Sequence, residues 1–174
     1  LQKCIDLLNY QLWGKAPVSP ISINVINTVD SAVPQVSFID REIISTIERG
    51  QYSVVDGQQR LTTNYKAYCN HDDFRNIVLD LGKGEFTEVR DSIRSNQIPV
   101  GILLNKEDTK LFEYTKAKSA LGSADVLSVL LQVRSKMRNY NYTLNSAEDL
   151  TEDEQIEWFE VLNNAGSRVS IIQM

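Results

Sequence analysis

A short polar segment at residues 56–63 combines one carboxylate, two amides, one guanidinium and two hydroxyls, in the order Asp-Gly-Gln-Gln-Arg-Leu-Thr-Thr. It follows an apolar run at residues 52–55 and precedes a stretch with helical character, which predicts a strand that leads into a helix. A helix N-terminus favours anions through its free N–H groups and its dipole, and an arginine adds a bidentate phosphate donor. A site for a phosphate-bearing ligand is therefore one interpretation of the segment.

Asp56 has two interpretations within this segment. As the N-cap residue it would accept hydrogen bonds from backbone N–H groups, and Gln59 would return the bond in a variant of the capping box. This interpretation leaves Gln58, Arg60 and the two threonines unaccounted for. In the phosphate interpretation, Asp56 would repel the ligand unless a divalent metal lay between them, as in nucleotide sites that hold Mg²⁺ through one carboxylate. The residues alone leave both interpretations open.

The elements that position this segment are predicted from hydrophobic periodicity and turn residues. Helices are expected at residues 1–13, from Asp40 to Gly50, from the polar segment to about Asn70, in most of the chain after Thr109, and from Thr151 onward with Glu154 completing a capping box. Strands or extended segments are expected at residues 21–25, 51–55, 77–81, 86–89 and 98–104, with a hairpin turn at 82–84. The fold class is therefore α+β, with a small mixed β-sheet and flanking helices in residues 1–105 and a mainly helical part in 106–174.

Length and composition are those of one globular domain that buries a core: 174 residues, 42% hydrophobic and 24% charged. A net charge of −5 argues against a nucleic-acid footprint that covers the whole domain. No apolar run is long enough to span a membrane and no signal peptide is present, so we expect a cytoplasmic protein. The chain starts at Leu1 inside a predicted helix and stops as a new element begins, which indicates a piece excised from a longer polypeptide.

Few side chains suit metal or redox chemistry elsewhere in the chain. Cys4 and Cys69 are far apart and form no Cys-x-x-Cys pair, so we expect reduced thiols. A single histidine, His71, excludes most His-rich zinc sites and HNH-type nuclease sites within these residues. Residues 134–142 interleave basic and aromatic side chains, which fits either contact with nucleic acid or a solvated helix face opposite Val133 and Met137.

Two stretches resemble a known family. Residues 54–63, Val-Val-Asp-Gly-Gln-Gln-Arg-Leu-Thr-Thr, resemble the hallmark of the DUF262 family, the N-terminal domain of modification-dependent restriction systems of the GmrSD type, which is related to the ParB/sulfiredoxin fold. Residues 158–170, Trp-Phe-Glu-Val-Leu-Asn-Asn-Ala-Gly-Ser-Arg-Val-Ser, resemble the family's Phe-x-x-Leu-Asn-x-x-Gly-x-x-Leu-Ser element. The two stretches occur in the expected order, so the resemblance covers most of the chain as one domain, residues 1–174.

The resemblance implies a ParB/sulfiredoxin-like domain that binds and hydrolyses a nucleoside triphosphate with Mg²⁺, as the sensor or regulator of a prokaryotic defence enzyme. It also implies an HNH-like nuclease domain in cis or in trans, with DNA contacted through other domains. Carried over to this sequence, the catalytic residues would be Asp56, Gln58, Gln59 and Arg60, with Asp56 also holding the metal. The remaining ligand contacts would come from Gly57, Thr62, Thr63, Asn163, Gly166 and Arg168.

The sequence departs from the family in the segment before the motif. Family members usually carry Pro-x-x-Gln-Arg-x-Tyr-x-Trp there, whereas residues 33–38 keep only part of this pattern and Arg41 is the nearest arginine. Residues 163–166 also carry Asn and Gly, which are ordinary stop signals at the end of a helix. Two alternative functions follow: a ParB-like DNA-binding or nuclease module whose polar segment contacts nucleic-acid phosphate, and an inactive scaffold that binds a partner.

Overall fold

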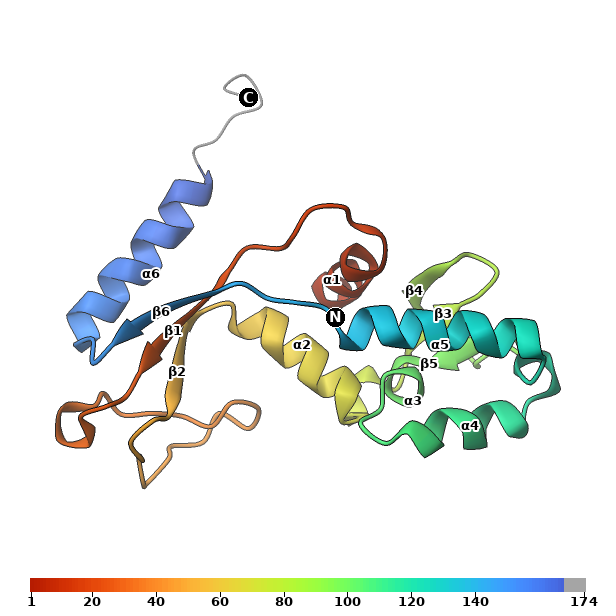
Figure 1. Ribbon diagram of the computed structural model, residues 1–174, viewed down its shortest axis with the longest axis horizontal. Coiled ribbons are helices and arrows are strands. Elements are labelled where there is room, and N and C mark those ends of the chain that lie inside the picture. Colours follow the sequence, from red (N-terminus) through yellow and green to blue (C-terminus); the bar gives the residue numbers. More distant parts are fainter. Residues whose placement is uncertain (168–174) are drawn as a thin grey trace, which may run out of the picture. The chain divides into compact units, whose positions relative to one another are not determined.

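The structure is a computed structural model that describes residues 1–167, and it has the expected α+β class. The chain divides into two compact units (Figure 1). Unit 1 contains residues 1–17 and 59–141, and unit 2 contains residues 18–58 and the chain from residue 142 onward. Within the described part of the chain, no helix is both long enough and apolar enough to cross a membrane.

Unit 2 is built on a mixed three-stranded sheet with the order β2-β1-β6. Its strands are β1 (Ile21–Val25), β2 (Tyr52–Asp56) and β6 (Leu144–Glu148). β2 is antiparallel to β1, and β6 is parallel to β1. Helix α6 (Glu152–Ser167) packs against β2 and begins with the predicted capping box, in which the Glu154 backbone N–H donates to Thr151 Oγ1 at 3.2 Å.

Unit 1 combines an antiparallel sheet of order β4-β3-β5 with helices that bury one shared core. Its strands are β3 (Ile77–Asp80), β4 (Glu85–Glu88) and β5 (Gln97–Pro99). Its α-helices are α1 (Gln2–Trp13), α2 (Gln58–Tyr68, whose first residue belongs to unit 2), α3 (Val100–Leu103), α4 (Asp108–Lys116) and α5 (Ala124–Arg138). Short 3₁₀ turns complete the described elements: Asp72–Phe74 and Ser119–Leu121 in unit 1, and Val29–Ser31 in unit 2.

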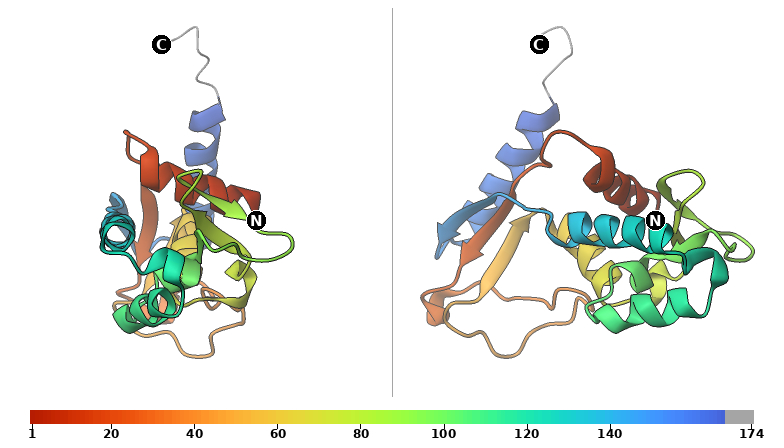
Figure 2. Two further views of the ribbon diagram at one scale, coloured as in Figure 1. Left: turned by 90° about the vertical axis from the view of Figure 1, so that its right-hand side faces the viewer. Right: turned by 45° about the vertical axis from the view of Figure 1, so that its right-hand side comes forward.

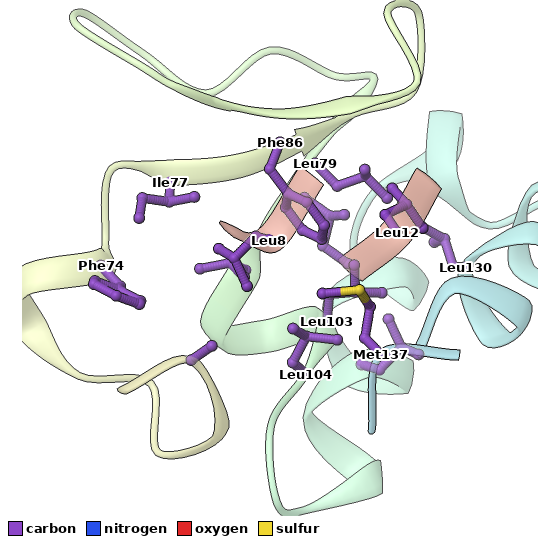
Figure 3. Packing of buried hydrophobic residues seen from close by; sticks show 14 of the residues in the cluster. Leu8, Leu12, Phe74, Ile77, Leu79, Phe86, Leu103, Leu104, Leu130 and Met137 are labelled. Atoms are coloured by element: carbon purple, nitrogen blue, oxygen red, sulfur yellow. The ribbon is translucent and has the colours of Figure 1, made fainter. Parts of the chain in front are cut away.

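The core of unit 1 joins residues that are distant in sequence. Figure 3 shows Leu8 and Leu12 of α1 beside Leu79 and Phe86 of the sheet, and Met137 of α5 beside the short α3. The leucines and Phe86 are almost fully removed from water, which provides the main favourable term for folding of this unit. Both cysteines are free thiols, as predicted.

The helix predicted from Asp40 to Gly50 is wrong. The connection between β1 and β2 contains no α-helix, as Figure 2 shows for the orange part of the chain. An isolated bridge joins Val36 to Ile43, and the Ile44 backbone N–H donates to the Gln35 carbonyl at 2.9 Å. Isoleucines and threonines are stiff at χ1 and disfavour a helix, and extended backbone pairing satisfies this segment instead.

Three further expectations are corrected. Strand β6 lies in the part that was predicted to be helical, because Leu-Asn-Ser-Ala-Glu has little strand propensity and depends on pairing with β1. Residues 98–104 are extended only to Pro99 and then form α3. Helix α6 does not stop at residues 163–166 but continues to Ser167, so the Asn and Gly there lie within the helix.

Arg134 corrects the prediction of a solvated helix face at residues 134–142. Its side chain is buried and donates to the carbonyls of Leu103 at 2.6 Å and Asn105 at 2.7 Å, and it also pairs with Asp108. These bonds join α5 to the segment between α3 and α4. Arg138 donates to the same carboxylate of Asp108 at 3.1 Å. Both arginines of this stretch therefore bind groups within unit 1.

Candidate functional site

The polar segment lies at the junction between β2 and α2, as the sequence predicted. Asp56 is the last residue of β2 and pairs with Ser22 of β1, Gly57 follows, and α2 starts at Gln58. The position immediately before the helix therefore belongs to Gly57, and the N-cap position predicted for Asp56 is off by one residue. The physical reason is that sheet pairing extends through Asp56, so the chain turns one residue later.

Gly57 makes this turn with a φ of +97° and is buried. Side chains with a Cβ disfavour the left-handed region because the Cβ approaches the following carbonyl oxygen. Replacing Gly57 with alanine is therefore expected to lower the free energy of unfolding by about 1–2 kcal/mol. Urea denaturation of the purified chain measures this change.

Gly50→Ala is the matched comparison for that variant. Gly50 has a φ of +89°, and a Cβ built there meets no atom within 4 Å, so its alanine variant reports backbone strain alone. We expect Gly57→Ala to lose at least as much stability as Gly50→Ala, since Gly57 is buried. A Gly57→Ala protein as stable as the wild type would show that the turn does not require glycine.

A cavity of about 370 Å³ lies within unit 2, beside this junction. Its walls come from residues 33–44, from β2, from the start of α2 and from α6. Gln58 of the polar segment is one of its lining residues, together with Tyr52 and Ser53 of β2. The volume falls in the range that small-molecule sites occupy, which makes this the candidate ligand site of unit 2.

The side chains that line the cavity are amides, aromatic rings, aliphatic groups, a hydroxyl and one guanidinium. The four amides are those of Gln35, Gln51, Gln58 and Gln155. Two of them are held by the backbone, because Gln35 Nε2 donates to the Val33 carbonyl at 2.8 Å and Gln155 Nε2 donates to the Leu150 carbonyl at 3.0 Å. None of the lining residues is a carboxylate, so the cavity suits an anionic ligand with a planar group.

Arg41 is the one arginine among the described residues that line this cavity. It lies in the turn closed by the Val36–Ile43 bridge, where the Ser37 backbone N–H donates to the Glu42 carbonyl at 2.7 Å. The sequence identified Arg41 as the arginine nearest to the motif but placed it in a helix, which would not have predicted its place beside Gln58. Backbone pairing within residues 35–44 forms the turn that holds Arg41, and the hydrophobic pattern of this segment did not indicate it.

Comparison with known proteins agrees with the resemblance of the two motifs. The family model described as the GmrSD restriction endonuclease, N-terminal domain, matches residues 22–172. The chain belongs to this family. No curated protein and no solved structure matches the chain. The matched range includes the β2–α2 junction, Arg41 and α6, so the candidate site lies within the GmrSD-type domain.

The other predicted motif residues of this GmrSD-type domain belong to unit 1, because the unit boundary falls between Gln58 and Gln59. Gln59 is exposed, and Arg60 and Thr62 are partly buried on the same helix. Thr63 is buried, and its hydroxyl donates to the Gln59 carbonyl at 2.8 Å, which is a bond within α2. The buried hydroxyl of Thr63 therefore has a hydrogen-bond partner within the protein and does not require a ligand.

The second motif stretch lies on α6 of unit 2. Asn163 is exposed, and its Nδ2 donates to the Phe159 carbonyl at 2.7 Å. Gly166 is within the last turns of the helix, and Arg168 lies outside the described residues. Among the α6 residues, the cavity is lined by Gln155, which sequence reasoning did not select. Its position one helical turn after the start of α6 carries no motif that would have indicated it.

Proposed function

We propose that this GmrSD-type domain binds a nucleoside triphosphate beside the β2–α2 junction and acts as the sensor or regulatory domain of a restriction enzyme in prokaryotic defence. The observation that carries the proposal is the cavity of unit 2, in which Gln58 of the family motif lies with Arg41 and without any carboxylate. Phosphate is favoured by a guanidinium and by N–H donors, and a lining carboxylate would repel it.

The cavity also provides a surface for the base. Tyr52 lines it with 68% of its surface exposed, so a stacked base would remove a large aromatic area from water. The amides of Gln51 and Gln155 combine donors and acceptors, which suits the polar edge of a base. These features support a nucleotide over inorganic phosphate alone.

Mg²⁺ would be held by Asp56 in this proposal. The described residues form no cluster of three or more His, Cys, Asp or Glu side chains, so the protein offers no closed metal cage there. A single carboxylate that shares the ion with phosphate oxygens and water is the usual arrangement for Mg²⁺ in nucleotide sites. When bound, the ion would neutralise phosphate charge next to Asp56.

For hydrolysis we propose that Gln58 orients the attacking water. Nucleotide occupancy would then control an HNH-type nuclease domain in cis or in trans. In this scheme the domain itself senses the nucleotide, and DNA cleavage belongs to the partner domain.

Replacing Gln58 with alanine is expected to weaken nucleoside triphosphate binding by about tenfold, the loss of one hydrogen bond to a charged group. Thermal-shift titration of the chain with ATP, GTP, CTP and UTP, with and without Mg²⁺, measures binding, because bound ligand stabilises the folded state by RT ln(1 + [L]/Kd). Gln132→Ala on the exposed face of α5 is the matched control and keeps wild-type affinity. If none of the four nucleotides shifts the melting curve of the wild type, the proposed function is wrong.

A further inference from the structure

We propose that Arg41 is the phosphate-binding cation of this cavity, and that its left-handed backbone conformation is retained for ligand binding at the expense of stability. The inference rests on the proposed nucleotide function and names a residue outside the two family motifs. Its ligand class is a polyphosphate, because the group concerned is a single guanidinium in an otherwise uncharged cavity.

The backbone of Arg41 is the first observation. Its φ is +59°, a region that arginine seldom adopts. Two hydrogen bonds hold the turn around it: the Ser37 backbone N–H donates to the Glu42 carbonyl, and the Glu42 backbone N–H donates to Ser37 Oγ at 3.0 Å. Conformations of this kind persist where the surrounding structure imposes them, and they concentrate at ligand sites. Glycine would fit this position without strain, but it would remove the guanidinium.

The second observation is where the side chain lies. Arg41 lines the same cavity as Gln58 and Tyr52, which places this arginine on the wall that the family motif also reaches. Among the residues that the structure describes, none forms a hydrogen bond or ion pair with the Arg41 side chain. An exposed guanidinium that is not engaged by the protein can bind a ligand without first breaking an internal ion pair.

The third observation is the charge of unit 2. Of the 18 basic residues of the chain, three fall in unit 2, whereas 12 of the 23 acidic residues do. The three are Arg41, Arg49 and Arg168, and Arg168 lies outside the described residues. The acidic residues include both chain neighbours of Arg41, Asp40 and Glu42.

Arg49 does not replace Arg41 in this role. The pKa of Asp149 is lowered by hydrogen bonds from the backbone N–H groups of Thr28 and Asn27 and, to a smaller degree, by the charge of Arg49. Arg49 therefore faces a carboxylate of its own unit and does not line the cavity. Without Arg41, the described residues that line the cavity would include no basic side chain, in a unit whose charge is acidic.

The test compares Arg41→Gly, Arg41→Lys and Arg49→Gly in the whole 174-residue chain, by calorimetric titration with the four nucleoside triphosphates in Mg²⁺. Arg41→Gly is expected to bind the preferred triphosphate at least about tenfold more weakly while its melting temperature is no lower than that of the wild type. Arg41→Lys keeps the charge and recovers part of the affinity. Arg49→Gly keeps wild-type affinity.

The outcomes separate this inference from the proposed function. A wild-type chain that binds a nucleotide, together with an Arg41→Gly chain that binds it equally well, overturns the role of Arg41 and leaves nucleotide binding intact. A wild-type chain that binds none of the four nucleotides overturns both. Loss of binding in Arg41→Gly with a lower melting temperature overturns the claim that the left-handed conformation is kept at the expense of stability.

Discussion

Replacing Arg134 with methionine is expected to lower the free energy of unfolding by about 2–4 kcal/mol. The guanidinium is buried and donates to the carbonyls of Leu103 and Asn105, at 2.6 and 2.7 Å. Methionine fills a similar volume but provides no donor, so two buried carbonyl oxygens lose their partners. The free energy of unfolding, obtained from urea denaturation followed by circular dichroism, measures the loss.

Arg138→Met is the matched control for this variant. Arg138 pairs with the same carboxylate of Asp108 at 3.1 Å, but both side chains are in contact with solvent, at 32% and 73% exposed. Exposed ion pairs contribute little, so we expect a loss of less than about 1 kcal/mol. If Arg134→Met and Arg138→Met lose equal stability, the hydrogen bonds of Arg134 to the two carbonyls do not stabilise the junction between α3 and α4.

Replacing Asp80 with asparagine is expected to lower the free energy of unfolding by about 1–3 kcal/mol near neutral pH. The buried carboxylate accepts hydrogen bonds from the backbone N–H groups of Gly82 at 2.9 Å and Lys83 at 3.1 Å, and from Gln97 Nε2 at 2.8 Å. Gln97 cannot rotate its amide to adapt, because its Oε1 already accepts from the Arg94 backbone N–H. With the asparagine oxygen kept toward the backbone N–H groups, its amide nitrogen would face Gln97 Nε2, and two N–H donors would oppose each other.

The same contacts make this contribution depend on pH. The hydrogen bond from Gln97 is the main reason that the pKa of Asp80 lies below its ordinary value, and the backbone N–H groups of Lys83 and Gly82 lower it further. A carboxyl whose folded pKa is depressed stabilises the protein above its unfolded pKa of about 3.9, and this stabilisation is lost as the pH falls through the folded pKa. The stability difference between wild type and Asp80→Asn should therefore shrink below about pH 4.

Urea denaturation at a series of pH values measures that difference. Asp91→Asn, at an exposed position of the same unit, is the control and should differ little from the wild type at any pH. A difference between wild type and Asp80→Asn that stays constant down to about pH 3 would show that protonation of Asp80 does not contribute to acid sensitivity.

Local sequence determined the elements whose signals lie within a few residues. The alternation of residues 21–25, the apolar run before Asp56 and the capping box at Thr151 each predicted an element that the structure contains. The glycine turn between two apolar strands predicted the β3–β4 hairpin. Such signals act through backbone conformations and short-range hydrogen bonds, so they can be read without the rest of the chain. The two motifs likewise indicated the family, because their residue types are specific in themselves.

Tertiary structure alone decided the features that depend on distant partners. β6 exists because β1 offers a parallel edge to Leu144–Glu148. The periodicity of α5 predicts that Arg134 faces solvent. It is buried instead, because its guanidinium donates to the carbonyls of Leu103 and Asn105. Arg41 joins Gln58 in one cavity because a bridge between Val36 and Ile43 folds the connection into a turn. For β6 and Arg134 the stabilising partner is many residues away, and no local periodicity records which distant groups will meet.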